Sequence, residues 1–142
     1  MKPKDYFDSV AKEYSKNRTK GIHGYFANKE LKLVMKFLDV KKGEKILDAG
    51  CGSGLYCNII KKLGGNPYGI DISEKMIKNL KKNKIQGKIA NIENFSLKKK
   101  FDKSLSVGVF EFIKNQDSAI KSIKKHLKKN GTLVVHYPRK SI

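Results

Sequence analysis

The sequence has 142 residues, and 32 lysines and arginines against 13 aspartates and glutamates give a formal net charge of +19. This length suits one domain, and 39% hydrophobic residues are enough for a packed core, which argues against an intrinsically disordered chain. No apolar run reaches the roughly 20 residues of a membrane span, no signal peptide opens the chain, and two cysteines are too few for a disulfide framework, so we expect a cytoplasmic protein that is not transmembrane.

Two amphipathic helices are expected within residues 1–42, where they would cover the main fold. The first has apolar residues on one side of a helix, namely Tyr6, Phe7, Val10, Ala11 and Tyr14. A turn is expected around residues 21–24. Apolar residues from Phe26 to Leu38 then indicate a second helix, which ends before residues 41–43.

Strands and helices alternate through the rest of the chain, residues 43–142. We expect strands at 45–49, 67–71, 88–91, 104–109 and 132–137, and helices at 55–63, 73–82 and 116–128. This alternation predicts an α/β fold with a mostly parallel, five-stranded, doubly wound sheet in three layers. In such a fold the ligand crevice lies at the carboxyl ends of the central strands.

The segment ILDAGCGSG, residues 46–54, passes from a strand into a helix through three glycines. Glycine lets the backbone approach a ligand closely, and the start of a helix presents free N–H groups. The dinucleotide fingerprint G-x-G-x-x-G would require glycine three residues after Gly52, but that residue is Leu55. Dinucleotide binding is therefore disfavoured.

A carboxylate, Asp71, ends the next expected strand. An acid at this position can accept hydrogen bonds from both hydroxyls of a ribose. The plain alternatives are that Asp71 caps the helix near Ser73 and that backbone N–H groups hold Asp48. Because Asp71 and the glycine turn belong to one βαβ unit, we favour a nucleoside ligand.

These segments resemble the class I S-adenosylmethionine-dependent methyltransferases. ILDAGCGSG is similar to the first motif of the family and GIDIS, residues 69–73, to its second; the resemblance continues through residues 90–93, 101–113 and 127–135. The opening, residues 6–18, resembles the subgroup that methylates small molecules and quinone-like lipids. The resemblance implies a Rossmann-like fold, S-adenosylmethionine as cofactor, S-adenosylhomocysteine as product, and in-line methyl transfer to a small-molecule or lipid-like acceptor.

The resemblance also implies a set of cofactor-binding residues. Those near the methionine part of the cofactor would be Asp48, Gly50, Cys51, Gly52 and Val107; Asp71 would hold the ribose; Ile72, Asn91 and Ile92 would contact the adenine. Asn91 stands where the family more often has aspartate, but its amide oxygen can still accept a hydrogen bond. For Ile72 and Val107 the plain alternative is a buried strand residue.

Arg18 stands out because the chain has only two arginines. A guanidinium can bind the carboxylate of the cofactor at two points, which an ammonium cannot. Tyr14, one helical turn earlier, could close over the sulfonium, an attraction worth about 0.5–2 kcal/mol. The alternative is that Tyr14 belongs to the core and Arg18 to the surface.

A general base is needed only if the acceptor must lose a proton. The candidates are His23 in the loop after the first helix, His136 at the end of the last strand and Glu111 after the fourth strand, and each has a structural alternative. A nucleophilic role for Cys51 is not expected, because no histidine accompanies it in the sequence. No cluster of histidine, cysteine, aspartate and glutamate suggests a metal site.

The charge leaves a second hypothesis open. Dispersed lysines are typical of solvated helix faces, but they could also attract RNA, DNA or an anionic membrane, which would fit an RNA methyltransferase. A third hypothesis is a cofactor-binding subunit or fragment that is inactive alone. Because the family continues past the fifth strand, we expect this chain to lack a C-terminal part. The edge at 132–137 would then be covered by a homodimer, a partner chain or the rest of a longer protein.

Overall fold

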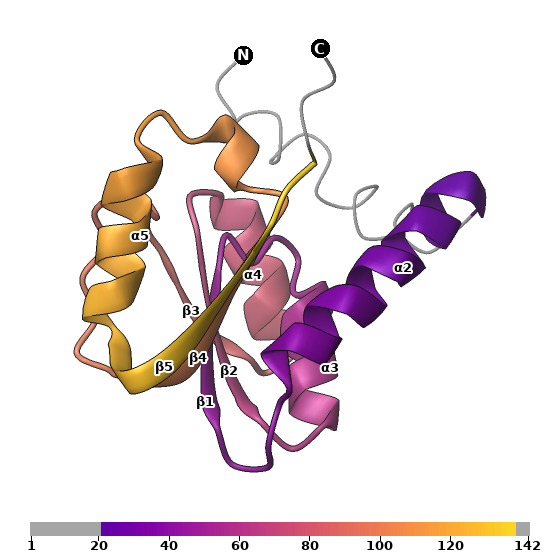
Figure 1. Ribbon diagram of the computed structural model, residues 1–142, viewed down its shortest axis with the longest axis horizontal. Helices are drawn as coiled ribbons and strands as arrows, with labels where there is room; N and C mark the ends of the chain where they lie inside the picture. The colour runs from indigo at the N-terminus through magenta and orange to yellow at the C-terminus, as the bar shows by residue number, and fades with distance from the viewer. Residues whose placement is uncertain (1–20, 139–142) are drawn as a thin grey trace.

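In the computed structural model, residues 21–138 are described, and they form a five-stranded sheet between helices (Figure 1). The strands are β1 (Lys45–Ala49), β2 (Asn66–Asp71), β3 (Gln86–Ile89), β4 (Phe101–Val107) and β5 (Leu127–His136). They lie in the order β3-β2-β1-β4-β5, and each neighbouring pair is parallel. The predicted doubly wound α/β fold is confirmed.

Helices cover both faces of the sheet. They are α2 (Gly21–Leu38), α3 (Leu55–Lys62), α4 (Glu74–Lys82) and α5 (Gln116–Lys125), with a short 3-10 helix, η1 (Phe110–Phe112), after β4. Figure 1 shows α5 on one side of the sheet and α2, α3 and α4 on the other. Each side has its own buried core: Ile123 of α5 packs with Leu47 and Phe101, whereas Val34 of α2 packs with Ile46 and Leu105.

Local signals explain where the helices begin. Ser73 precedes α4, and its hydroxyl accepts a hydrogen bond from the backbone N–H of Met76, as expected for an N-cap. Asn115 caps α5 in the same way through Ser118. The helices predicted at 55–63 and 73–82 are confirmed to within one residue.

Five of the segments predicted from the sequence differ in the structure. Residues 21–24 belong to helix α2 and form no turn, so His23 does not lie in a loop. Strand β3 lies at 86–89 and not at 88–91. The prediction missed its position because an exposed edge strand shows little alternation of apolar and polar residues. Strand β4 begins and ends earlier than predicted, at Phe101 and Val107. Helix α5 ends at Lys125, before the predicted residue 128, because strand β5 already begins at Leu127 and not at the predicted residue 132.

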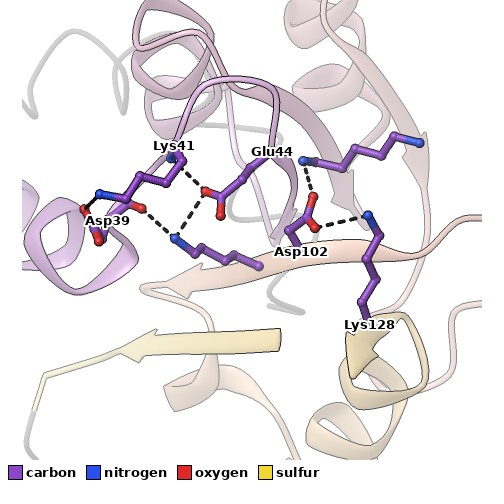
Figure 2. Close-up of polar contacts among 7 residues, drawn as sticks. Asp39, Lys41, Glu44, Asp102 and Lys128 are labelled. Atoms are coloured by element: carbon purple, nitrogen blue, oxygen red, sulfur yellow. Dashed lines mark hydrogen bonds and ion pairs between the residues drawn. The ribbon is translucent and has the colours of Figure 1, made fainter. Parts of the chain in front are cut away.

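Polar contacts connect neighbouring strands at the amino-terminal end of the sheet (Figure 2). The carboxylate of Asp102 on β4 accepts a hydrogen bond from the backbone N–H of Lys45 on β1 at 2.8 Å and contacts the ammonium of Lys128 on β5 at 3.1 Å. Asp102 therefore ties three neighbouring strands together. These two partners, the Lys45 N–H first, lower the pKa of Asp102 below its ordinary value.

We expect Asp102→Asn to lower the free energy of unfolding by about 1 kcal/mol at pH 7, because a charge-assisted contact in a half-exposed site is lost. A carboxylate whose pKa is lowered by folding stabilises the protein above its unfolded pKa, and this contribution disappears as the pH falls from about 4 through the folded pKa. Urea denaturation of both proteins at neutral and acidic pH measures the difference. A difference that persists unchanged in acid would contradict this role.

Strand β5 pairs only with β4 within residues 21–138, so its other edge carries no strand there. That a second copy or a partner chain covers this edge stays a prediction. Among the described helices, none combines the length and apolar character needed to cross a membrane.

Candidate functional site

A cavity of about 280 Å³ opens at the carboxyl ends of four strands. Its walls are Gly50 and Gly52 after β1, Asp71 and Ile72 after β2, residues 90–93 after β3, and residues 107–109 and 112–114 at the end of β4 and beyond it. Parallel strands bring these loops together although they are far apart in sequence. The crevice predicted from the strand pattern thus exists, and most of its lining is apolar.

The glycine turn forms one wall of this cavity. The backbone N–H groups of Gly50 and Cys51 both donate to the carbonyl of Ile70 on β2, at 2.8 and 2.9 Å, which fixes the turn against the sheet. Gly50 has φ of +81°, and a side chain there would collide with the side chain of Val109, which also lines the cavity. A glycine is therefore required here for the conformation and for the space.

Asp71 lies at the cavity with both carboxylate oxygens placed by backbone donors. One oxygen accepts from the N–H of Gly52 and the other from the N–H of Ser73, each at 2.9 Å. The contact with Ser73 agrees with the alternative that Asp71 shapes the start of α4, although Ser73 itself is the cap. Because a carboxylate oxygen accepts more than one hydrogen bond, Asp71 retains acceptor capacity toward the cavity.

A second, smaller hollow of about 30 Å³ adjoins the first and shares Gly50, Gly52 and Val107 with it. Asp48 lines this hollow and is only 2% exposed. The carboxylate of Asp48 accepts a hydrogen bond from the thiol of Cys57 at 3.5 Å. The glycine turn therefore separates two carboxylates, one in each hollow.

The two cysteines are buried thiols. Burial raises the pKa of Cys51 and of Cys57 well above the ordinary value, and the negative charge of Asp48 raises each pKa further. Both thiols are thus neutral at physiological pH, which agrees with the expectation that Cys51 is not a nucleophile. Cys51 contributes to the wall of the smaller hollow.

The wall that follows β3 is held by side chains. The amide oxygen of Asn91 accepts from the N–H of Glu93 at 2.9 Å, and a carboxylate oxygen of Glu93 accepts from the N–H of Asn115 at 2.8 Å. The hydroxyl of Ser122 on α5 donates to the Glu93 carbonyl. Ile92, between these residues, is buried and lines the cavity.

His126, at the end of α5, contacts the chain just after this wall, at Phe95 and Leu97. Its Nε2 accepts from the N–H of Leu97 at 2.9 Å, which leaves Nδ1 to donate to the carbonyl of Ser122 at 2.6 Å. The ring also stacks on Phe95, with centroids 4.4 Å apart. His126 was not among the residues selected from the sequence, because its partners are all distant or backbone groups.

The three candidate bases lie in different places. His136, at the end of β5, has Nδ1 3.6 Å from a carboxylate oxygen of Glu30 on α2, and the other Glu30 oxygen accepts from the hydroxyl of Tyr56 at 3.1 Å. Glu111 lies in η1 with one carboxylate oxygen buried and without a hydrogen-bond partner in the described structure. His23 lies in α2, and its side chain is outside the described part.

Neither His136 nor Glu111 lines the two hollows, although Tyr56 lines the smaller one. The predictions for Tyr14 and Arg18 fall outside the described residues. In residues 21–138, no group of three histidine, cysteine, aspartate or glutamate side chains could hold a metal ion.

The structure adds lining residues that the sequence did not single out. They follow β4 and are Gly108, Val109, Phe112, Ile113 and Lys114, together with Ala90 and Glu93 after β3. All but Lys114 lie in the segments 90–93 and 101–113, which resemble the family, and all follow a strand whose carboxyl end meets the others at this edge of the sheet.

Comparison with known proteins places this site in a family. Residues 47–135 match a family model described as a methyltransferase domain, and this segment holds the glycine turn, Asp71 and the wall after β4. The ubiquinone biosynthesis O-methyltransferase of Pelagibacter ubique is 41% identical over 100 residues, which cover 66% of this chain and 42% of that protein.

Two solved structures share the fold. A protein described as a methyltransferase, in complex with the Trm112 methyltransferase activator of Haloferax volcanii, has a TM-score of 0.74 at 19% identity and covers 89% of this chain and 57% of its own. Coclaurine N-methyltransferase bound to N-methylheliamine and SAH has a TM-score of 0.69 at 20% identity, over 82% of this chain and 37% of its own. This chain spans about half the length of the curated relatives that it matches.

Proposed function

Because the chain belongs to the methyltransferase domain family, within the class I S-adenosylmethionine-dependent methyltransferases, we propose that it transfers a methyl group from S-adenosylmethionine to a small-molecule or lipid-like acceptor. The observation that carries this proposal is the placement of Asp71 and the glycine turn around one cavity. The turn supplies space and Asp71 supplies hydrogen-bond acceptors, which a ribose with two hydroxyls requires.

The residues present fit this cofactor. Asp71 would hold the ribose; Ile72, Asn91 and Ile92 would contact the adenine; the turn from Gly50 to Gly52, with Asp48 and Val107, would surround the methionine part. When bound, the cofactor supplies a methyl group on a positively charged sulfur, so the carboxylate of Asp48 in the adjoining hollow favours that charge. The chain contributes mainly alignment, which can supply roughly 7–11 kcal/mol.

The rim of the cavity supports an apolar acceptor. Val109 and Ile113 line it, and Phe112, which also lines it, is 45% exposed. Next to them, Phe110 stacks on Tyr137, with ring centroids 6.1 Å apart. Apolar side chains exposed at a ligand cavity are typical of sites for small apolar molecules. The similarity to a ubiquinone biosynthesis O-methyltransferase supports the same class of acceptor.

Among the candidate bases, His136 lies beside a carboxylate that also contacts a residue of the smaller hollow. Its Nδ1 lies 3.6 Å from a carboxylate oxygen of Glu30, and the other Glu30 oxygen accepts from the hydroxyl of Tyr56, which lines the smaller hollow. We therefore propose His136 as the base if the acceptor must lose a proton. His23 and Glu111 remain the alternatives.

The experiment combines calorimetric titration with S-adenosylmethionine and turnover on a panel of phenols, amines and RNA. We expect cofactor binding, methylation of an apolar phenol or amine, and a lower kcat with unchanged cofactor affinity for His136→Asn. Methylation of RNA alone would favour the RNA methyltransferase hypothesis. Binding without turnover would favour a cofactor-binding subunit that needs a partner, whereas no binding would refute the proposal.

A further inference from the structure

A separate groove of about 410 Å³ lies at the other end of the molecule from the proposed cofactor site. Its lining includes Tyr68 on β2, Gln86 at the start of β3, Lys81 in the last turn of α4, Lys84 just after that helix, and Lys99 before β4. None of these residues lines the cofactor cavity. The groove therefore lies near the amino end of β3, whereas the cavity lies at the carboxyl ends of the strands.

The groove is positively charged, and its lining contains lysines without a carboxylate. Three of its lining residues are lysines, and among the described residues no aspartate or glutamate lines it. Residues 75–92 contain six lysines and no acid. Where carboxylates do occur at this end of the sheet, lysines elsewhere engage them, as Figure 2 shows for Glu44 and Asp102. The charge of the groove is therefore not neutralised locally.

One of these lysines is held in position. The ammonium of Lys99 lies 4.4 Å from the centre of the Tyr68 ring and donates a hydrogen bond to the side-chain oxygen of Gln86 at 2.9 Å. A cation over an aromatic face is attracted to it, so the side chain is ordered before any ligand arrives. The groove thus combines an oriented ammonium, an aromatic ring and an amide.

We propose that this groove binds the backbone of a single-stranded nucleic acid. Proteins that bind unpaired strands follow the backbone with a positively charged groove, and three lysines supply such a groove here. The ring of Tyr68, whose face the Lys99 ammonium covers, orients that ammonium toward the phosphates. A membrane surface fits less well, because none of the exposed large apolar side chains lines the groove and none could insert there. This inference stands apart from the identity of the methyl acceptor.

The test measures binding of the full chain to fluorescein-labelled oligouridylate and oligothymidylate by anisotropy over a range of salt concentrations. The groove variant combines Lys81→Gln, Lys84→Gln and Lys99→Gln. Each lost phosphate contact removes about 0.7 from the slope of log K against log salt, so the variant is expected to lose about 2 from the slope and about a hundredfold in affinity at roughly 0.1 M salt.

The matched control combines Lys121→Gln, Lys124→Gln and Lys129→Gln, which are exposed lysines outside the groove and change the net charge equally. We expect its slope and affinity to stay close to those of the wild type. Lys99→Gln alone, with a slope change of about 0.7, tests the groove if the triple variant does not fold. Unchanged S-adenosylmethionine binding shows that a variant is folded.

Three results would overturn the proposal. The first is an equal loss in the groove and control variants, which would assign binding to diffuse charge. The second is absence of binding by the wild type. The third is binding to phosphatidylserine vesicles that depends on the groove while neither oligonucleotide binds.

Discussion

Replacing Asp71 with alanine is expected to weaken S-adenosylmethionine binding by roughly a hundredfold, or about 3 kcal/mol, because two charge-assisted hydrogen bonds to the ribose would be lost. The carboxylate is already placed for this role by the N–H groups of Gly52 and Ser73. Isothermal titration of the wild type and the variant gives the two dissociation constants directly. Asp71→Asn, which keeps one acceptor oxygen, should fall between them.

The matched control is Asp117→Ala, which removes an exposed aspartate from the first turn of α5. Asp117 does not line the cavity, so its loss should leave the dissociation constant unchanged. An Asp71→Ala protein that folds and binds the cofactor as tightly as the wild type would remove the observation on which the proposed function rests.

Replacing Gly50 with alanine is expected to destabilise the fold by about 3 kcal/mol and to abolish cofactor binding. The positive φ of Gly50 is unfavourable for any residue with a Cβ, by about 1–2 kcal/mol. The added methyl would also meet the side chain of Val109, whose displacement would narrow the cavity. Urea denaturation measures the first effect, and isothermal titration measures the second.

Gly43→Ala is the control variant that imposes the unfavourable backbone conformation without the steric collision. Gly43 has a similar φ of +84°, but nothing lies within 4 Å of an added Cβ. This variant should lose only the conformational part, about 1 kcal/mol, and should bind the cofactor normally. If Gly50→Ala behaves like Gly43→Ala in both measurements, the close packing of the glycine turn against Val109 plays no part in the site.

The central βαβ unit could be predicted from the sequence because its signals are local. Buried strand β1, the glycines of the turn, and Ser73 as a helix cap each act through neighbours in the chain. The parallel orientation of the strands followed from the alternation of strands and helices. The family resemblance assigned Asp71 and Val107, which are far apart in the sequence, to one site, and both line the cavity.

Other features depend on contacts that the sequence does not reveal. Strand β4 begins at Phe101, whose N–H donates to the carbonyl of His126, and its polar residues Asp102 and Lys103 hide this start from a hydrophobic pattern. The same is true of His126, whose ring joins α5 to the loop at Leu97. Such residues become visible only when distant segments are folded together.

The grouping of lysines in the basic groove is also not visible in the sequence. Along the chain, Lys81, Lys84 and Lys99 look like parts of a dispersed, solvated surface. Folding brings them around one hollow beside Tyr68. Their spacing in sequence carries no information about this grouping, because it arises from the pairing of β2 with β3.

The crystal structure of the full chain with S-adenosylhomocysteine tests the central claim most directly. We predict that the ribose hydroxyls lie within hydrogen-bond distance of Asp71, that the adenine lies beside Ile72 and Ile92, and that the sulfur lies near the turn at Gly50. A structure in which the molecule occupies another site, or leaves Asp71 without contact to the ribose, would contradict the account.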